Sequence, residues 1–251
     1  MAQNPVELSI EPSQTYCICK EETKAKTVVV GFPGHGLVGS IAAKYIVKEL
    51  DLKVVGFIRS PLIPPLAVFL DGILAYPYRI YSSDDSDIAV LIGESPAPVQ
   101  AYYYIAQAVL DWGVQVGAEE VVCLDGFSTG QSSNDVYLVA EPDIKTKFEG
   151  IDLPRPQTGY IGGLSGALLN ETILRDIDGY SLLVSTQSQF PDPIGAAKLI
   201  EVLNDIKGFQ VNTASLISDG EKIRNTMQEF ADRTRHFHDD GALEDRSSLY
   251  I

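Results

Sequence analysis

The sequence has few cysteines and no long apolar run, and each shortage restricts the class of protein. Three cysteines among 251 residues cannot pair evenly, and such low use of cysteine is typical of a reducing compartment. No apolar stretch approaches the roughly 20 residues of a membrane-spanning helix. Residues 1–10 also lack the basic-then-apolar order of a signal peptide. We therefore expect a cytoplasmic protein with no structural disulfide and no membrane partner.

Basic residues are scarce as well. The chain has 19 Lys and Arg against 34 Asp and Glu, a formal net charge of -15. Nucleic acids and anionic lipid head groups bind proteins through clustered Lys and Arg, so we expect no nucleic-acid partner. The excess of negative charge favours solubility and does not by itself define an acidic binding surface.

Apolar residues are plentiful, and their arrangement predicts an α/β fold. The hydrophobic content of 45% allows a sizeable core. A β-branched run at residues 27–31 ends in a glycine-rich turn, a helical pattern follows at residues 37–50, and a second apolar run occupies residues 53–58. This order is a βαβ unit, which favours parallel pairing of its two strands. The same signals predict strands at residues 88–92, 120–124 and 182–185 and helices at residues 99–116 and 193–207. We expect a mostly parallel sheet flanked by helices.

We expect one domain and a tail. The Pro- and Gly-rich stretches at residues 60–65 and 141–163 are interpreted as loops, because strand patterns resume on both sides of each. A helix over residues 215–235 closes a single α/β domain spanning residues 1–235. Beyond it the apolar periodicity disappears while Asp, Gly, Ser and Arg dominate, so residues 236–251 are predicted to be a flexible tail.

Gly34, Gly36 and Gly39 have the G-x-G-x-x-G spacing of a dinucleotide-binding turn, after a strand and before a helix. Such a site also needs an acidic residue at the end of the next strand to bind the ribose. That end reads Phe-Ile-Arg-Ser at residues 57–60, where the arginine suits only a 2′-phosphate. Glycines at such a turn are also required for close helix packing and positive φ angles. We favour this structural role and keep nucleotide binding by the turn from Gly31 to Gly39 as an alternative.

Ser128 is the serine of a G-x-S-x-G sequence that follows a strand, as in the nucleophile elbow of hydrolases. In the elbow the serine leads directly into a helix, whereas residues 131–134 are turn-like and residues 136–140 have the pattern of a strand. The candidate bases are His35 and two histidines of the expected tail, where a triad is not held in place. Hydrolysis at Ser128 is the second enzymatic alternative, and we expect no enzyme activity.

Two groups of potential metal ligands are present. Cys17 and Cys19 place two thiols on one face of a short strand, and residues 236–240 contain two histidines and two aspartates. Neither group supplies the four ligands at defined spacing that a zinc site usually requires. We therefore expect no metal and no cofactor. His35, inside the glycine turn, is assigned no catalytic role, because a turn histidine is more commonly hydrogen-bonded to the backbone.

The segment at residues 61–70 is apolar but broken by three prolines, which exclude a helix or a central strand through it. Exposed apolar surface on a soluble protein usually marks a subunit or partner interface. Burial under the protein's own loops is the alternative. This segment is our candidate for the contact of a homo-oligomer.

Leu249, Tyr250 and Ile251 are three bulky apolar or aromatic residues at the end of a segment otherwise made of Asp, Glu, Arg, Ser and Gly. A terminal carboxylate beside an aromatic ring and an aliphatic residue forms a three-point anchor for a partner that offers a lysine, a slot and an apolar wall. A tail that folds back onto the protein's own surface is the alternative, and composition alone does not separate the two.

Three sequence blocks resemble one known family. They are VVVGFPGHGLVG at residues 28–39, GGLSGALL at residues 162–169, and PDP at residues 191–193, which leads into a helix. On these blocks the chain resembles the proteasome assembly chaperone family, and within it the archaeal homologues that associate with the proteasome core particle. The resemblance covers roughly residues 20–235.

The resemblance implies an α/β protein related in fold to purine nucleoside phosphorylases, non-enzymatic and homo-oligomeric, with the α-subunits of the core particle as partners. It also implies a role for the tail, because a hydrophobic-Tyr-any sequence at a free carboxyl terminus enters pockets between neighbouring α-subunits. By this resemblance the Ile251 carboxylate meets a pocket lysine, Tyr250 packs at the pocket mouth, and Leu249 contacts an apolar wall.

Overall fold

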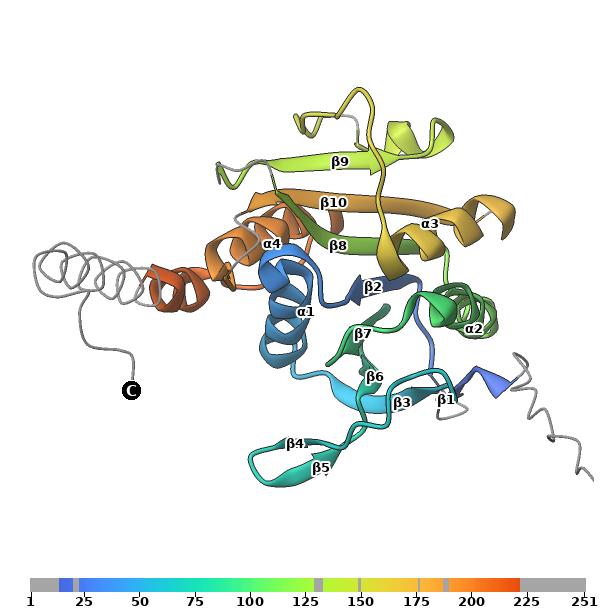
Figure 1. The fold of residues 1–251 in the computed structure, drawn as a ribbon. Helices are drawn as coiled ribbons and strands as arrows, with labels where there is room; N and C mark the ends of the chain where they lie inside the picture. Colours follow the sequence, from blue (N-terminus) through green and yellow to red (C-terminus); the bar gives the residue numbers. More distant parts are fainter. Residues whose placement is uncertain are drawn as a thin grey trace, which may run out of the picture.

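The computed structural model describes residues 14–19, 23–128, 133–148, 150–175, 177–186 and 190–221. They form an eight-stranded sheet with helices on both faces and a separate two-stranded hairpin, which confirms the α/β fold (Figure 1). The strands are β1 (Tyr16–Cys19), β2 (Thr27–Gly31), β3 (Lys53–Arg59), β4 (Val68–Leu70), β5 (Ile73–Ala75), β6 (Tyr78–Ser82), β7 (Ile88–Gly93), β8 (Glu120–Ser128), β9 (Val136–Ala140) and β10 (Asp178–Thr186). The longer helices are α1 (Val38–Glu49), α2 (Tyr102–Val116), α3 (Gly163–Arg175) and α4 (Pro193–Lys207), and short 3-10 turns are η2 (His35–Leu37), η3 (Val99–Ala101) and η4 (Asp143–Phe148).

The sheet has a parallel centre and antiparallel edges. Its strand order is β1-β3-β6-β7-β2-β8-β10-β9. The neighbours β7, β2, β8 and β10 are parallel, whereas β1, β3 and β6 on one side and β9 on the other pair antiparallel with their neighbours. Every residue of the central strand β2 is buried, as expected for a strand covered on both faces.

Helices on opposite faces of the sheet cover two apolar cores. Figure 1 shows α1 and α4 on one side of the sheet and α2 and α3 on the other. Successive residues of β2 serve the two cores alternately: Val29 packs in the core under α1 and α4, whereas Val28 and Val30 pack in the core under α2 and α3. This period of two is the ordinary geometry of a strand.

The predicted βαβ unit is correct in the order of its elements and wrong in its pairing. β3 does not pair with β2, because β6 and β7 lie between them, and β3 instead pairs antiparallel with β1 and β6. From Val55 onward the burial of β3 alternates, which is the pattern of an antiparallel strand with one open face. The apolar run at residues 53–58 therefore identified a strand but not its neighbours.

Local signals explain several helix ends. Asp192 caps α4 by accepting a hydrogen bond from Gly195 N at 2.8 Å, Pro193 occupies the first turn, and the helix stops at Gly208 with φ 69°. The final predicted helix is present at residues 214–221, and its remainder lies outside the described residues. Within the part of the chain that the structure describes, no helix is long and apolar enough to cross a bilayer.

Candidate functional site

The residues with the most specific sequence prediction, Leu249, Tyr250 and Ile251, lie outside the described residues. Their role as a partner anchor stays a prediction, and so does the flexibility of residues 236–251. Two other surfaces of the described structure have the properties of functional sites. One is a cavity at the carboxyl ends of the central strands, and the other is the β4–β5 hairpin.

The cavity lies where the chain leaves two adjacent parallel strands toward opposite faces of the sheet. The loop after β2 leads to α1 on one face, and the loop after β7 leads to α2 on the other. Ligands of open α/β sheets bind at such switch points, because the diverging loops leave a crevice between them. Here a cavity of about 550 Å³ is lined by residues 32–35, 95–97, 125–128 and 160–165, together with Tyr78, Tyr102 and Leu183.

Asp125, near the end of β8, is the acidic residue on the wall of this cavity. Its Oδ1 accepts a hydrogen bond from Gly126 N at 2.8 Å, and its Oδ2 accepts one from Ser165 Oγ at 2.9 Å. The carboxyl group thereby joins β8 to the first turn of α3. Burial raises the pKa of Asp125, although both hydrogen bonds and the neighbouring His35 oppose this shift.

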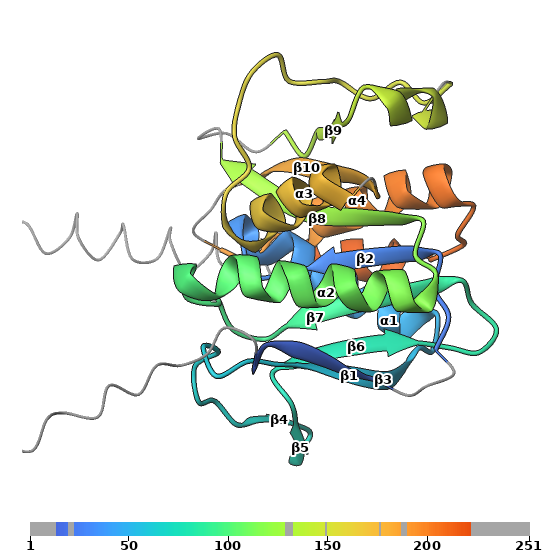
Figure 2. The same cartoon turned by 90° about the vertical axis from the view of Figure 1, so that its right-hand side faces the viewer.

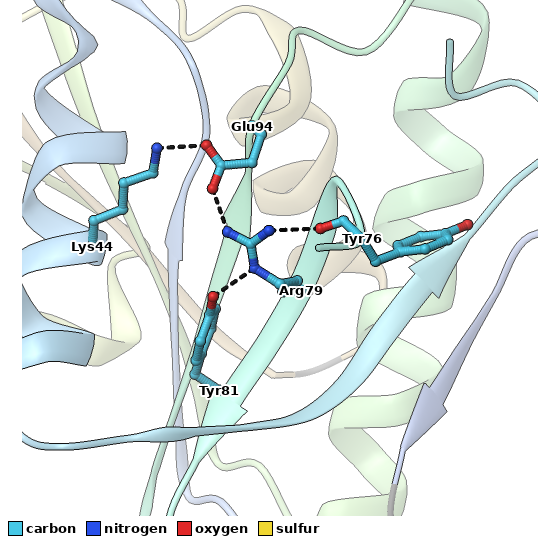
Figure 3. Close-up of polar contacts among 5 residues, drawn as sticks. All are labelled: Lys44, Tyr76, Arg79, Tyr81 and Glu94. Carbon is cyan, nitrogen blue, oxygen red and sulfur yellow. Dashed lines mark hydrogen bonds and ion pairs between the residues drawn. The ribbon is translucent and has the colours of Figure 1, made fainter. Parts of the chain in front are cut away.

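A buried ion pair fixes the start of the loop that follows β7 (Figure 3). The Arg79 guanidinium of β6 donates to Glu94 at the end of β7, to the carbonyl oxygen of Tyr76 at 2.7 Å, and to Tyr81 Oη at 2.5 Å. Lys44 of α1 donates to the second oxygen of Glu94. The Arg79 and Glu94 side chains are only 3% and 10% exposed. The network therefore holds in place the segment that continues into Ser95 and the cavity wall.

The glycine-rich turn packs against the protein's own atoms at all three motif positions. A Cβ on Gly34 would lie 2.4 Å from Asp125 Oδ1. A Cβ on Gly39 would lie 2.1 Å from the carbonyl oxygen of Leu124, and one on Gly36 would lie 2.6 Å from Thr186 Oγ1. Gly36 also has a φ of 60°, which favours glycine. These contacts give the glycines the structural role favoured from the sequence, and the Thr186 side chain occupies the space beside Gly36 that a pyrophosphate would approach.

Ser128 does not sit on a nucleophile elbow. It is the last residue of β8 and pairs with Thr186 of β10, whereas an elbow serine occupies a sharp strand-to-helix turn. Residues 129–132 lie outside the described part of the chain, which resumes at residue 133 and enters β9 at Val136. Ser128 is exposed and lies on the wall of the 550 Å³ cavity.

The β4–β5 hairpin projects away from the main sheet in both views (Figures 1 and 2). Its turn residues Asp71 and Gly72 have φ angles of 50° and 78°, as in the tight turns that favour Asp-Gly.

Most of the large apolar side chains of the hairpin are exposed to solvent: Phe69 by 73%, Ile73 by 72% and Leu74 by 79%. The prediction that part of the proline-rich segment stays exposed and forms no central strand is therefore confirmed.

Sequence patterns did not single out several of these residues. Asp125 and Ser95 belong to strand ends that are distant in sequence, and only the sheet order brings them to one cavity. Arg79 interrupts the apolar pattern of β6, so the sequence pattern that indicates a strand is weak there. The Asp-Gly turn between two apolar triplets was the one local signal for the hairpin.

An α/β protein with an exposed apolar hairpin and a closely packed glycine turn matches a known family over most of its length. Residues 28–231 match the model of the PAC2 family, and the chain belongs to this family. The Methanocaldococcus jannaschii protein MJ0106 is 33% identical over 224 residues, which cover 85% of this chain and 89% of that protein.

Solved structures agree with this assignment. The crystal structure of Pyrococcus furiosus PbaA, described as an archaeal homolog of proteasome-assembly chaperone, has a TM-score of 0.81 and 28% identity, covering 90% of this chain and 95% of that one. Pyrococcus furiosus PbaB, described as an archaeal proteasome activator, has a TM-score of 0.76 over 87% of this chain and 99% of that one. At 21% identity, PbaB shows the shared fold alone. The resemblance inferred from the three sequence blocks is confirmed.

Proposed function

We propose that this protein is a non-enzymatic, cytoplasmic partner of the proteasome core particle, acting as an assembly chaperone or as an adaptor or activator. Its α/β body, residues 1–235, builds a homo-oligomer. Its tail, residues 236–251, docks in pockets between α-subunits through Leu249, Tyr250 and Ile251.

The observation that carries this proposal is the relationship to PbaA. An identity of 28% with a TM-score of 0.81 over 90% of the chain is a likeness of the whole described fold, and that relative is described as a homolog of proteasome-assembly chaperone. The positions of Gly36, Gly39 and Ser128 agree with a non-enzymatic role, because the two glycines pack against protein atoms and the serine ends a strand.

The exposed side chains of the β4–β5 hairpin support the proposal that the chain forms a homo-oligomer. An isolated two-stranded hairpin is marginally stable in water, and this one exposes Phe69, Ile73 and Leu74 at once. Clustered apolar side chains on a protein surface generally mark an interface. A second copy of the chain that covers the hairpin would remove this surface from water and order the hairpin.

The oligomer matters for binding because a single tail is a weak anchor. A three-residue anchor contributes about 4–6 kcal/mol, which corresponds to millimolar or weak micromolar affinity. Several tails on one oligomer make the later contacts intramolecular and add about a hundredfold in avidity when their spacing matches the ring. In this arrangement the Ile251 carboxylate pairs with a pocket lysine, Tyr250 packs at the mouth, and Leu249 contacts an apolar wall.

The test is co-sedimentation with an archaeal proteasome core particle. The full chain is compared with a chain that lacks Leu249, Tyr250 and Ile251, and with a control that lacks residues 246–248. The control tail is equally short but keeps the terminal motif. We expect the full chain and the control to sediment with the core particle and the first deletion to stay in the supernatant. Equal binding by all three chains would contradict tail docking, and no binding by the full chain would contradict the proposed function itself.

A further inference from the structure

The cavity between the β2 and β7 loops has no part in the proposed docking, yet it has the properties of a ligand site. It lies at the switch point of the parallel strands, and its volume of about 550 Å³ is that of a small-molecule pocket. The buried Arg79–Glu94 pair holds one wall and the Asp125–Ser165 hydrogen bond holds another. Both walls are therefore held by contacts within the chain.

The charges on the cavity wall select against anions. Among the described residues that line it there is no lysine or arginine, and Asp125 supplies a carboxyl group. The two hydrogen bonds that this carboxyl group accepts come from neutral donors, Gly126 N and Ser165 Oγ. Buried carboxylates are ordinarily paired with a cation. On this wall only the exposed imidazole of His35 lies nearby as a basic group.

Aromatic rings and an unused hydroxyl complete the lining. Phe32, Tyr78, Tyr102 and Phe127 contribute to the wall, and aromatic rings attract organic cations through their negative faces. Ser95 lies on the same wall, and its buried Oγ has no hydrogen-bond partner among the described residues. Such an unpartnered buried hydroxyl costs free energy that a bound ligand recovers by hydrogen bonding to it.

We propose that this cavity binds a small organic ammonium ion with an apolar body, in which the Asp125 carboxylate is the counter-ion and Ser95 Oγ accepts one ammonium N–H. The aromatic side chains enclose the apolar body and add cation–π attraction. The overall charge of -15 raises the local concentration of cations at the protein surface. Ligand binding is independent of the tail, so it is tested separately from proteasome docking.

The test is isothermal titration calorimetry on the full chain with three amines and their alcohols as probes. The pairs are phenethylamine and phenethyl alcohol, cyclohexylamine and cyclohexanol, and cadaverine and pentanediol. Each alcohol keeps the shape of the amine and lacks its charge. We expect at least one amine to bind about tenfold or more tightly than its alcohol, as a charge-assisted hydrogen bond implies.

Three variants locate the site. Asp125→Asn should reduce the affinity for the amine to that for the alcohol, and Ser95→Ala should weaken amine binding about fivefold, because a buried hydrogen bond is lost. Ser40→Ala is the matched control, since Ser40 Oγ is also buried without a partner but lies in α1, away from the cavity lining. It should leave the affinity unchanged.

Three results would overturn the proposal. The first is that no amine binds more tightly than its alcohol. The second is that Asp125→Asn binds the amine as tightly as the original chain. The third is that Ser40→Ala weakens binding as much as Ser95→Ala. Folding of each variant is verified by its thermal unfolding transition, and Ser95→Ala should not lower the melting temperature because it breaks no hydrogen bond.

Discussion

At the residue scale, Asp125 makes the stability of the protein depend on pH. Burial raises its pKa above the ordinary carboxyl value of 3.8. Between that value and the raised one, the folded protein binds more protons at this group than the unfolded chain does. The free energy of unfolding that Asp125 contributes is therefore fully present at low pH and falls as pH rises through the folded-state pKa.

Asp125→Asn should remove this dependence. The amide oxygen can still accept from Gly126 N and the amide nitrogen can donate to Ser165 Oγ, so we expect no loss of stability at neutral pH. Urea unfolding over a series of mildly acidic to neutral pH values should show a smaller decline for the variant than for the original chain. Asp84→Asn, at an exposed position, is the control and should keep the original slope. An unchanged slope for Asp125→Asn would contradict the assignment.

The buried Arg79–Glu94 ion pair is predicted to contribute strongly to the free energy of unfolding. Glu94→Ala leaves the buried Arg79 guanidinium without its carboxylate and should cost about 3–5 kcal/mol of unfolding free energy in urea titrations. Lys53→Ala breaks the exposed Lys53–Asp51 pair and should cost less than about 1 kcal/mol. Equal effects of the two substitutions would show that burial does not determine the strength of the Arg79 pair.

At the element scale, periodicity and capping identified most of the central elements. The predicted helix at residues 193–207 coincides with α4, because Asp192, Pro193 and Gly208 mark its two ends. The strand at residues 136–140 coincides with β9. Local periodicity did not predict which strands pair, because the apolar run of β3 carries no information about its neighbouring strands. The long-range strand order β7-β2-β8 brings Ser95, which follows β7, and Asp125 of β8 into one cavity. No local sequence pattern contains that order.

The β4–β5 hairpin is predicted to form the contact between subunits. Replacing Phe69 and Leu74 together with Ser removes two of the most exposed apolar side chains of the β4–β5 hairpin. The double substitution should convert the proposed homo-oligomer to a smaller species in light scattering coupled to size-exclusion chromatography. Val99→Ser changes an apolar residue that is 72% exposed elsewhere on the surface and should leave the mass unchanged. An unaltered mass for the hairpin variant would exclude the hairpin from the subunit contact.

At the scale of the whole molecule, the proposed function requires both an oligomeric body and a docking tail. If the hairpin variant becomes monomeric, its intact tails should bind the core particle about a hundredfold more weakly than the oligomer, because avidity is lost. Surface plasmon resonance on immobilised core particles measures this difference. Equal affinity of the monomeric and oligomeric proteins would contradict multivalent docking while leaving the tail contact itself in place.

The most direct measurement of the central claim is a titration of the core particle with the full chain and with a chain that carries one glycine appended after Ile251. The appended residue moves the carboxylate away from the proposed pocket lysine and displaces Tyr250 from the second-to-last position. It leaves every described residue unchanged. We predict saturable binding of the full chain and loss of that binding for the extended chain. Identical binding curves for the two chains would contradict docking by the carboxyl terminus.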